Sequence, residues 1–185
     1  MVVEDKKKKI LEVALKLFNE NGIDNTSTSQ ISKEAGIATG TLYLYFENKA
    51  DLIIELGTSV QEESLESFLD LIDSSVSYES LEKFWLERVE WGVNNPDKHK
   101  FRIQFKSSPY NIKNTKLKIP DHEKKLINLI ENGIENKILK DLTPKYISRF
   151  FSAHVTFTVE YIIQTKTKER QIFFETFFDG IKYSK

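Results

Sequence analysis

Apolar residues recur along most of the chain with the spacing of an amphipathic α-helix. Near the N-terminus, Ile10, Ala14 and Leu17 follow one another at i, i+4 and i+7, so they share one face of a helix. Gly22 comes next, and a glycine in the left-handed conformation commonly ends a helix. We therefore predict a first helix over about Lys6 to Asn21.

Two short helices are predicted next. Ser27 precedes Gln30 at a spacing that lets each side chain bond a free backbone amide at a helix N-terminus. This helix covers Thr28–Ala35 and ends at Gly36, and another runs from about Thr39 to Tyr45. Because the turn between them is short and contains glycine, the pair forms a helix-turn-helix, in which the second helix lies across the first.

The rest of the chain alternates helical stripes with breaks. Asn48 or Glu47 can cap a long fourth helix, Pro144 suits the first turn of a later one, and the longest loop is expected at 107–120. Beyond the third, helices are predicted over about 49–74, around 81–92 with an end before Pro96, around 101–105 with an end before Pro109, over 126–138, over 144–164 and over about 168–183. No strand is predicted, so we expect an all-α fold of about nine helices.

The third predicted helix has two unlike faces. Leu42 and Phe46 lie on one face and are expected in the core. A helix that enters the major groove of DNA needs close backbone approach, short hydrogen-bonding groups, an apolar contact for a thymine methyl group and donors for phosphate. The opposite face offers all of these through Thr39, Gly40, Thr41, Tyr43, Leu44 and Tyr45. Phosphate attraction can come from the lysines at 6–9, 33 and 49 and from helix N-terminal amides.

Composition excludes several classes of protein. The chain has no cysteine, which excludes disulfides, thiolate nucleophiles and cysteine-ligated metals. It has no apolar run of the ~20 residues that a membrane span needs, and the N-terminal lysines lack the apolar stretch of a secretion signal, so we expect a cytoplasmic protein without a membrane partner. His99, His122 and His154 show no metal-ligand spacing, and we see no phosphate loop, nucleophile elbow or paired-carboxylate pattern. We expect no metal, no cofactor and no enzymatic activity.

The segment from Ile10 to Leu52 resembles the DNA-binding domain of the TetR family of transcriptional regulators. The matching positions are Ala14, Leu17, Phe18, Gly22, Thr26, Ile31, Ala35, Gly36, Gly40, Thr41, Leu42, Tyr43, Tyr45, Phe46, Lys49 and Leu52. The resemblance implies an all-helical homodimer whose C-terminal domain holds a small-molecule pocket and dimerises through the last two long helices. We thus expect a helix-turn-helix domain at 1–50 and an effector-binding and dimerisation domain at 51–185.

The resemblance also assigns DNA contacts residue by residue. Many members of the family have serine where this chain has Ala38, so the third helix either uses Thr39 as its cap or begins without a side-chain cap. The implied base contacts are Thr39, Gly40, Thr41 and Leu44, and the implied phosphate contacts are Tyr43, Tyr45, Lys49, Thr26 and Ser27.

Aromatic residues are frequent in the C-terminal part, where at helical spacing they are core residues by default. Together with the resemblance, they predict a cavity suited to a hydrophobic or aromatic effector with few polar groups. Three polar residues, Arg88, Arg102 and His154, are placed to orient such a ligand. The candidate pocket residues are Phe84, Trp85, Arg88, Phe101, Arg102, Phe105, Tyr110, Phe151 and His154.

The last two predicted helices carry more apolar surface than one core needs. Part of that surface is expected to be buried against a second copy of the chain. The candidate interface residues are Phe150, Thr158, Tyr161, Phe174, Phe177 and Phe178.

These features lead to one functional hypothesis and one alternative. The favoured function is that of a ligand-responsive transcriptional regulator, with repression as the favoured mode, that binds a pseudo-palindromic double-stranded DNA operator as a homodimer. The alternative is a helical module that binds an apolar metabolite and has weak or vestigial DNA binding. The sequence leaves open the effector, the operator and whether the 107–120 loop covers a pocket.

Overall fold

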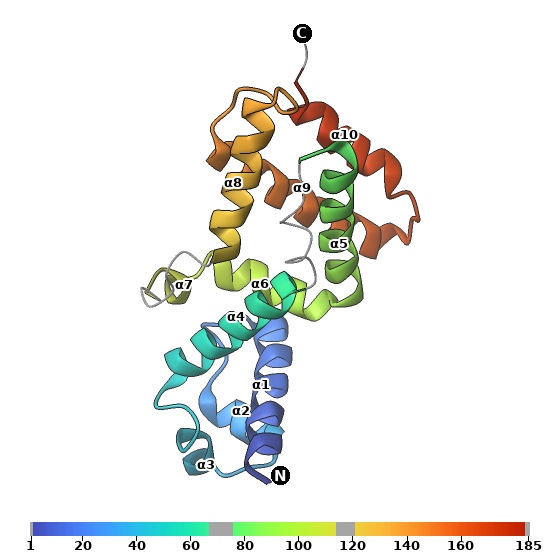
Figure 1. Cartoon of the computed structure of the whole chain (residues 1–185). Coiled ribbons are helices and arrows are strands. Elements are labelled where there is room, and N and C mark those ends of the chain that lie inside the picture. Colours follow the sequence, from blue (N-terminus) through green and yellow to red (C-terminus); the bar gives the residue numbers. More distant parts are fainter. Residues whose placement is uncertain (1, 67–75, 114–120, 184–185) are drawn as a thin grey trace. The chain divides into compact units, whose positions relative to one another are not determined.

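The computed structural model describes residues 2–66, 76–113 and 121–183, and these residues form helices joined by short connections (Figure 1). An antiparallel bridge joins Leu139 to Lys182. The ten helices within the described ranges are α1 (Val2–Asn21), α2 (Thr28–Ala35), α3 (Thr39–Tyr43), α4 (Lys49–Glu66), α5 (Tyr78–Asn94), α6 (Pro96–Lys106), α7 (Pro109–Lys113), α8 (Asp121–Glu135), α9 (Pro144–Thr165) and α10 (Gln171–Ile181). The all-α prediction is therefore confirmed.

The bounds of the N-terminal helices agree closely with the predicted ones. The prediction for α2 was correct at both ends, whereas α1 begins four residues earlier, at Val2 rather than Lys6, and α3 ends at Tyr43 rather than Tyr45. The predicted stretch of the fourth helix from residue 67 to Ser74 lies outside the described residues. Helix boundaries are the least certain part of a sequence prediction because the final turn depends on capping and packing.

The prediction of one long loop at 107–120 was wrong at its start. Pro109 opens the short helix α7, where proline fits because the first turn of a helix leaves its backbone amides unbonded. Residues 114–120, the rest of the predicted loop, lie outside the described residues. With α7, the described part of the chain has ten helices rather than about nine.

The helices form two compact units. The first unit contains residues 1–63 and 96–116, and the second contains residues 64–95 and 117–185. Helix α6 therefore belongs with α1 to α3, although the sequence assigned it to the C-terminal domain. The proposed domain boundary at residue 50 remains a prediction.

The first unit is built around one apolar core beneath the helix-turn-helix. Leu42 and Phe46, predicted to be core residues, are buried, as are the stripe residues Ile10, Ala14 and Leu17 of α1. The ring of Phe18 in α1 stacks on that of Phe101 in α6 with centroids 5.8 Å apart. The buried side chains of Leu42 and Phe46 thus attach α3 and the turn after it to this core.

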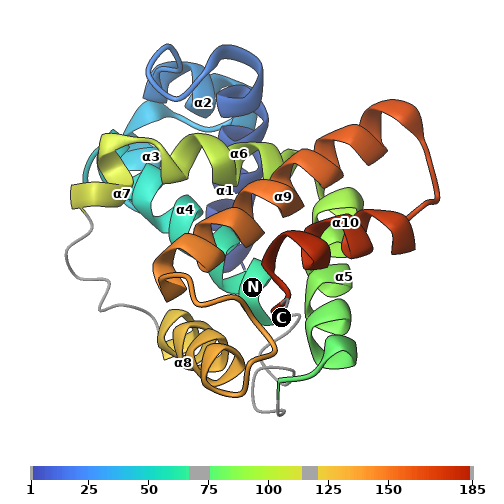
Figure 2. The same cartoon turned by 90° about the horizontal axis from the view of Figure 1, so that it is seen from above.

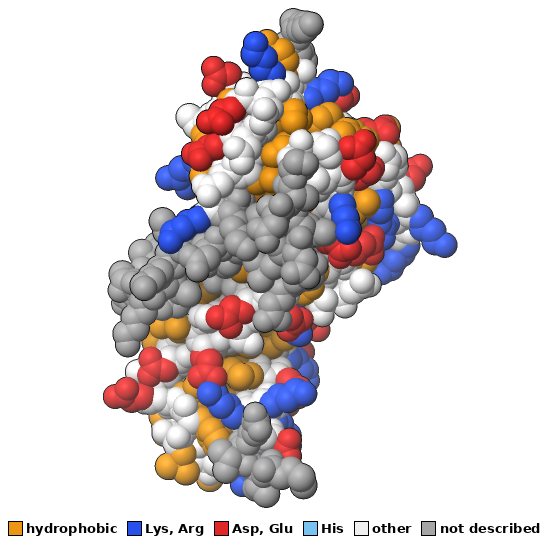
Figure 3. All heavy atoms as spheres, viewed as in Figure 1, with side chains coloured by type: hydrophobic (Ala, Val, Ile, Leu, Met, Phe, Trp, Pro, Cys, Tyr) orange, Lys and Arg blue, Asp and Glu red, His pale blue; other side chains and the backbone are white. Residues whose placement is uncertain are grey.

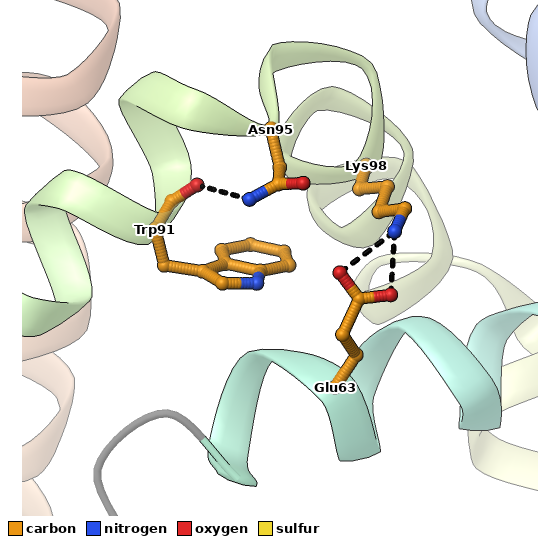
Figure 4. A network of polar contacts seen from close by, with 4 residues as sticks. All are labelled: Glu63, Trp91, Asn95 and Lys98. Atoms are coloured by element: carbon orange, nitrogen blue, oxygen red, sulfur yellow. Dashed lines mark hydrogen bonds and ion pairs between the residues drawn. The ribbon is translucent and has the colours of Figure 1, made fainter.

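Polar contacts fasten α6 to α1 and α4 within the same unit. The Asn19 side-chain amide donates to the carbonyl of Asp97 at 2.8 Å, and Nζ of Lys100 donates to the carbonyl of Asn19 at 2.8 Å. Lys98 and Glu63 form an ion pair at 2.5 Å (Figure 4). These contacts join residues that lie far apart in the sequence, so the sequence pattern did not predict them.

In the second unit, α9 packs against α5, α8 and α10, and its central position is visible in Figure 2. Ser77 and Ser80 form a capping box at the start of α5. At the other end of α5, the Asn95 side chain donates to the carbonyl of Trp91 at 3.0 Å (Figure 4). Near the C-terminus, the amide of Tyr183 donates to the carbonyl of Ile138 at 2.8 Å, which fastens the chain end to the α8–α9 connection. Among the described residues, no helix is both long enough and apolar enough to cross a lipid bilayer.

Candidate DNA interface

Local capping explains where α2 begins and ends, whereas α3 begins without a side-chain cap. The amide of Gln30 donates to Oγ of Ser27 at 3.1 Å, which is the half of the predicted capping box in which Ser27 caps α2. Gly36 ends α2 with φ +69°, a left-handed conformation that favours glycine. Ala38 occupies the N-cap of α3 and supplies no side-chain hydrogen bond, so α3 begins without a side-chain cap and the exposed Thr39 does not serve as one. The first residue of α3 is therefore free of a capping role.

The outward surface of α3 is apolar and hydroxyl-bearing, with no charged side chain. Leu44 is 83% exposed and Tyr43 is 47% exposed, while Thr39 and Gly40 are also exposed. Hydrophobic side chains gather at the α3 end of this unit, with acidic and basic side chains around them (Figure 3). Since Leu42 is fully buried on the opposite side, this short helix separates its two faces as the sequence predicted.

A hydroxyl pair joins α2 to α3. Oγ1 of Thr28, the first residue of α2, lies 3.1 Å from the phenol oxygen of Tyr43, the last residue of α3. Tyr45 and Thr41 are partly exposed beside this pair. Thr28 was not among the residues singled out from the sequence, because a pair 15 positions apart becomes visible only when the two helices cross.

Two of the residues assigned to phosphate contact have other partners in the structure. Thr26 is 1% exposed, and its hydroxyl donates to the carbonyls of Leu17 at 3.1 Å and Gly22 at 2.9 Å. Its side chain is thus internal and supports the turn after α1, so we leave it out of the interface proposed below. Lys49 is partly exposed and donates to the carbonyl of Asp24 at 3.1 Å, while Ser27 remains exposed.

The N-terminal lysines differ in what they contact. Nζ of Lys7 lies 2.5 Å from Glu55 and 5.7 Å from the ring centroid of Phe46, so Lys7 supports the helix packing. Nζ of Lys9 instead lies 3.9 Å from the position that a Cβ would have at Gly36, and Lys9 is exposed. The charge of Lys9 is therefore held next to the turn that leads into α3.

The candidate pocket residues fall in both units. Phe101, Arg102, Phe105 and Tyr110 belong to the first unit, where Phe101 and Phe105 are fully buried and stack with centroids 6.1 Å apart. Burial lowers the pKa of Arg102 below its ordinary value, because it penalises the charged guanidinium. The two phenylalanines are core residues of the helix-turn-helix unit, which is the ordinary role of an aromatic residue at helical spacing.

The other five candidates, Phe84, Trp85, Arg88, Phe151 and His154, lie in the second unit, and four of them pack in pairs. The rings of Phe84 and Phe151 lie 4.9 Å apart, and the indole Nε1–H of Trp85 donates to Nδ1 of His154 at 3.3 Å. Arg88 is buried and its guanidinium donates to the carbonyl of Ser64. The ordinary pKa of a histidine is about 6.5. Because burial lowers the pKa of His154 further, its imidazole is neutral near pH 7.

The candidate dimer residues divide into internal and surface positions. Phe174, Phe177 and Thr158 are at most 2% exposed within the chain's own core, whereas Tyr161 is 41% exposed. Phe150 and Phe178 are partly buried against the same core. The sequence could not separate these classes, because the broad apolar stripe of α10 does not show which of its residues face the chain's own core.

An exposed apolar surface runs along α9 and α10, through the predicted interface residue Tyr161 and through neighbours that were not predicted. Phe157 is 65% exposed and Ile172 is 53% exposed. The ring of Phe157 stacks on that of Tyr161 at 6.1 Å, and Tyr161 meets Phe173 edge to face at 5.7 Å. The i, i+4 spacing of Phe157 and Tyr161 is the signal that could have found this surface.

The chain is similar to known regulators, most clearly at its N-terminus. Residues 10–56 match the family model of bacterial regulatory proteins, tetR family. Over 74 residues, 40% of this chain, the sequence is 34% identical to the fatty acid metabolism regulator protein of Bacillus subtilis (strain 168), and this match spans 36% of that protein's length. The curated relative is thus matched over about a third of its length.

Solved structures share the fold over nearly the whole chain. A TetR family transcription regulator from Marinobacter aquaeolei VT8 has a TM-score of 0.85 at 19% identity, with 98% of this chain and 97% of that chain covered. The transcriptional regulator FadR from Bacillus subtilis, solved in complex with stearoyl-CoA, has a TM-score of 0.70 at 18% identity, with 93% and 95% covered. At these identities the likeness establishes the fold, an N-terminal helix-turn-helix followed by a helical C-terminal domain.

Proposed function

Because the chain belongs to the TetR family of bacterial regulatory proteins, we propose that it is a transcriptional repressor that binds a pseudo-palindromic operator as a homodimer and leaves it when an apolar effector binds. The family consists of regulatory proteins, so the expectation that the chain is not an enzyme is confirmed. The observation that carries the proposal is the outward face of α3, uncharged and exposed, on a helix whose inner face is fixed in the core.

The α3 face suits the edges of base pairs. Thr39 and Thr41 offer hydroxyls that can donate or accept, and Gly40 has nothing within 4 Å of the position that a Cβ would occupy, so the duplex can approach the backbone there. Leu44, at 83% exposure, supplies the apolar contact for a thymine methyl group. These four residues are the proposed base readers.

Phosphate binding is assigned to residues around this face. Tyr43, Tyr45, Ser27 and Lys49 remain in the proposed set, and Lys9 joins it because its ammonium lies beside the α2–α3 turn. Contacts of this kind fix the register of the protein on DNA without reading its sequence.

A second copy of the chain is the proposed cover for the apolar surface of α9 and α10. Phe157, Tyr161 and Phe173 are joined by ring contacts into one surface that a symmetric partner can bury, and Ile172 is a further exposed apolar residue of α10. Two recognition helices related by that symmetry would read half-sites about 34 Å apart or a multiple of it. The dimer also explains how a five-residue recognition helix gains useful affinity.

The release of DNA when the effector binds is proposed to act through α6. Helix α5 ends at Asn94 and α6 begins at Pro96, so a change in the orientation of α5 passes directly along the backbone. Within the first unit α6 is bonded to α1 through Asn19 and to α4 through Glu63. An effector would shift the DNA-binding equilibrium only by its difference in affinity for the two arrangements.

Fatty acyl compounds are the first effectors to test. The support is the likeness to the fatty acid metabolism regulator protein of Bacillus subtilis and to the FadR structure solved with stearoyl-CoA. An acyl chain also fits the earlier expectation of a largely apolar ligand. Stearoyl-CoA and stearate serve as probes, and coenzyme A alone is the control for the headgroup.

The direct test is selection of bound duplexes from a random pool by the purified protein. Enrichment of a palindrome with half-sites at helical-turn spacing is expected. Failure of folded, dimeric protein to enrich any duplex would contradict the proposal and favour the alternative of a metabolite-binding module without useful DNA affinity.

A further inference from the structure

We infer that Thr28 is a positioning residue for DNA binding, whose hydroxyl holds the phenol of Tyr43 in the orientation in which Tyr43 donates its proton to a phosphate. The inference rests on the proposed DNA-binding function. Its basis is the 3.1 Å contact between Oγ1 of Thr28 and the phenol oxygen of Tyr43.

The two partners differ in how their surroundings restrain them. Thr28 stands on α2, where the hydroxyl of Ser32 donates to its carbonyl at 2.8 Å, and its branched Cβ restricts its rotamers. Tyr43 ends a five-residue helix that has no side-chain cap, and its side chain is 47% exposed. The threonine therefore anchors the tyrosine rather than the reverse.

The protons can be assigned once a phosphate is present. Each hydroxyl carries a single proton, and a phosphate oxygen contacting DNA-binding side chains is an acceptor. When Tyr43 donates to phosphate, its oxygen is left to accept the proton of Thr28. The resulting chain runs from Thr28 through Tyr43 to phosphate, and each bond in it polarises the next.

Exposure separates this role from a direct contact. Thr28 is partly buried, whereas Tyr43 is 47% exposed. Holding the phenol before DNA arrives reduces the conformational freedom lost on binding. Thr28 thus contributes to affinity through Tyr43, and leaves the choice of base sequence to other residues of α3.

The test is a double-mutant cycle on the duplex selected by the wild-type protein. Thr28→Val removes the hydroxyl and keeps the shape, and we expect about five-fold weaker binding, the effect of one hydrogen bond. Tyr43→Phe is expected to weaken binding by at least as much. Thr28→Val should then cause no further loss in the Tyr43→Phe protein, because the group that Thr28 positions is already gone.

Two further variants separate positioning from a general effect on α3. Thr28→Ser keeps the hydroxyl and should bind within about two-fold of wild type. In the Leu44→Ala background, by contrast, Thr28→Val should still weaken binding by about five-fold, because the side chain of Leu44 is not a member of the Thr28–Tyr43 hydrogen bond. Thr28→Ala replaces Thr28→Val if thermal unfolding shows that the valine variant does not fold.

The inference is overturned if Thr28→Val has no effect in the wild-type background, or if its effect is the same with and without the phenol oxygen of Tyr43. Either result, with a duplex still selected by the wild type, leaves the proposed function intact. If the wild type selects no duplex at all, the proposed function fails and the positioning role falls with it.

Discussion

Gly57 of α4 lies directly against the ring of Phe105 of α6, so closely that a methyl group at Gly57 would overlap the ring. Phe105 is fully buried, and the two helices meet here because position 57 carries no side chain. In the proposed mechanism α6 transmits the effector signal. A shift of α6 would reach α4 through this contact. A glycine inside a helix is otherwise unfavourable by about 1 kcal/mol relative to alanine.

Replacing Gly57 by alanine should destabilise the first unit. Overpacking of a filled core costs about 1–3 kcal/mol, which exceeds the gain in helix propensity. Chemical denaturation of wild type and Gly57→Ala measures the difference. A Gly57→Ala protein as stable as wild type would show that α4 and α6 do not need this close approach.

Gly40→Ala is the matched control for Gly57→Ala, because Gly40 also lies in a helix. Here we expect no loss of stability. Nothing lies within 4 Å of the added methyl group, so stability should stay the same or rise by about 0.5–1 kcal/mol. Binding to the selected duplex should nevertheless weaken, because the methyl group would occupy space that the duplex needs. Unchanged affinity would contradict close approach of DNA at Gly40.

Lys9 and Lys7 should differ in the salt dependence of DNA binding. Lys9→Gln removes a charge beside the α2–α3 turn, and the slope of log K against log salt should fall in magnitude by about 0.9, the value for one phosphate contact. Lys16→Gln, on the same face of α1 two turns further on, is the control and should leave the slope unchanged.

Lys7→Gln should act differently, since Lys7 is paired with Glu55. It should leave the slope near the wild-type value and change stability by less than about 1 kcal/mol, as exposed ion pairs do. Equal slopes for the Lys9→Gln and wild-type proteins would remove Lys9 from the interface.

Phe157→Lys should separate the dimer without unfolding the chain. Phe157 is 65% exposed in the single chain, so its replacement removes little apolar packing from the core of the chain. In a symmetric dimer the two lysines would lie close together and repel each other. Sedimentation of the variant at several concentrations should show the monomer. Leu44→Lys, at an even more exposed apolar residue on α3, should remain a dimer, and dimeric Phe157→Lys would contradict the assigned surface.

The hydrogen bond between Trp85 and His154 should make the free energy of unfolding depend on pH. The indole N–H is a donor, so Nδ1 of His154 accepts from it and the neutral ring carries its proton on Nε2. Burial lowers the pKa of His154 in the folded chain, so the unfolded chain binds the proton more readily. The resulting stability is present above the unfolded pKa of about 6.5 and is lost as pH falls below it towards the folded pKa.

His154→Gln tests this pH dependence. Thermal midpoints of wild type and His154→Gln should diverge least at acid pH and most near pH 7, because the variant lacks the titrating group. Parallel curves for the two proteins over this range would show that His154 does not contribute to the acid sensitivity.

The sequence predicted local features well because their causes are local. Ser27 caps α2, Gly22 and Gly36 take the left-handed conformation, and Asn48 accepts from the amide of Asp51 at 3.0 Å at the start of α4. Capping and helical period depend on residues a few positions apart, so they can be read from the chain itself.

Features that depend on distant contacts were missed. The burial of Thr26, the pairing of Thr28 with Tyr43 and the docking of α6 through Asn19 all arise only when helices pack. Phe174 and Phe177 were assigned to a partner because a broad apolar stripe does not reveal which of its residues face the chain's own core. The DNA-reading residues themselves remain predictions.

The most direct test of operator recognition by α3 is the affinity of the wild-type protein for its selected duplex and for a scrambled duplex, followed across salt concentration. We expect tighter binding to the selected duplex at every salt concentration, with log K falling linearly as log salt rises, because neutralised phosphates release their counterions. Equal affinity for the two duplexes, or affinity that does not respond to salt, would contradict the claim that α3 and its flanking residues read an operator.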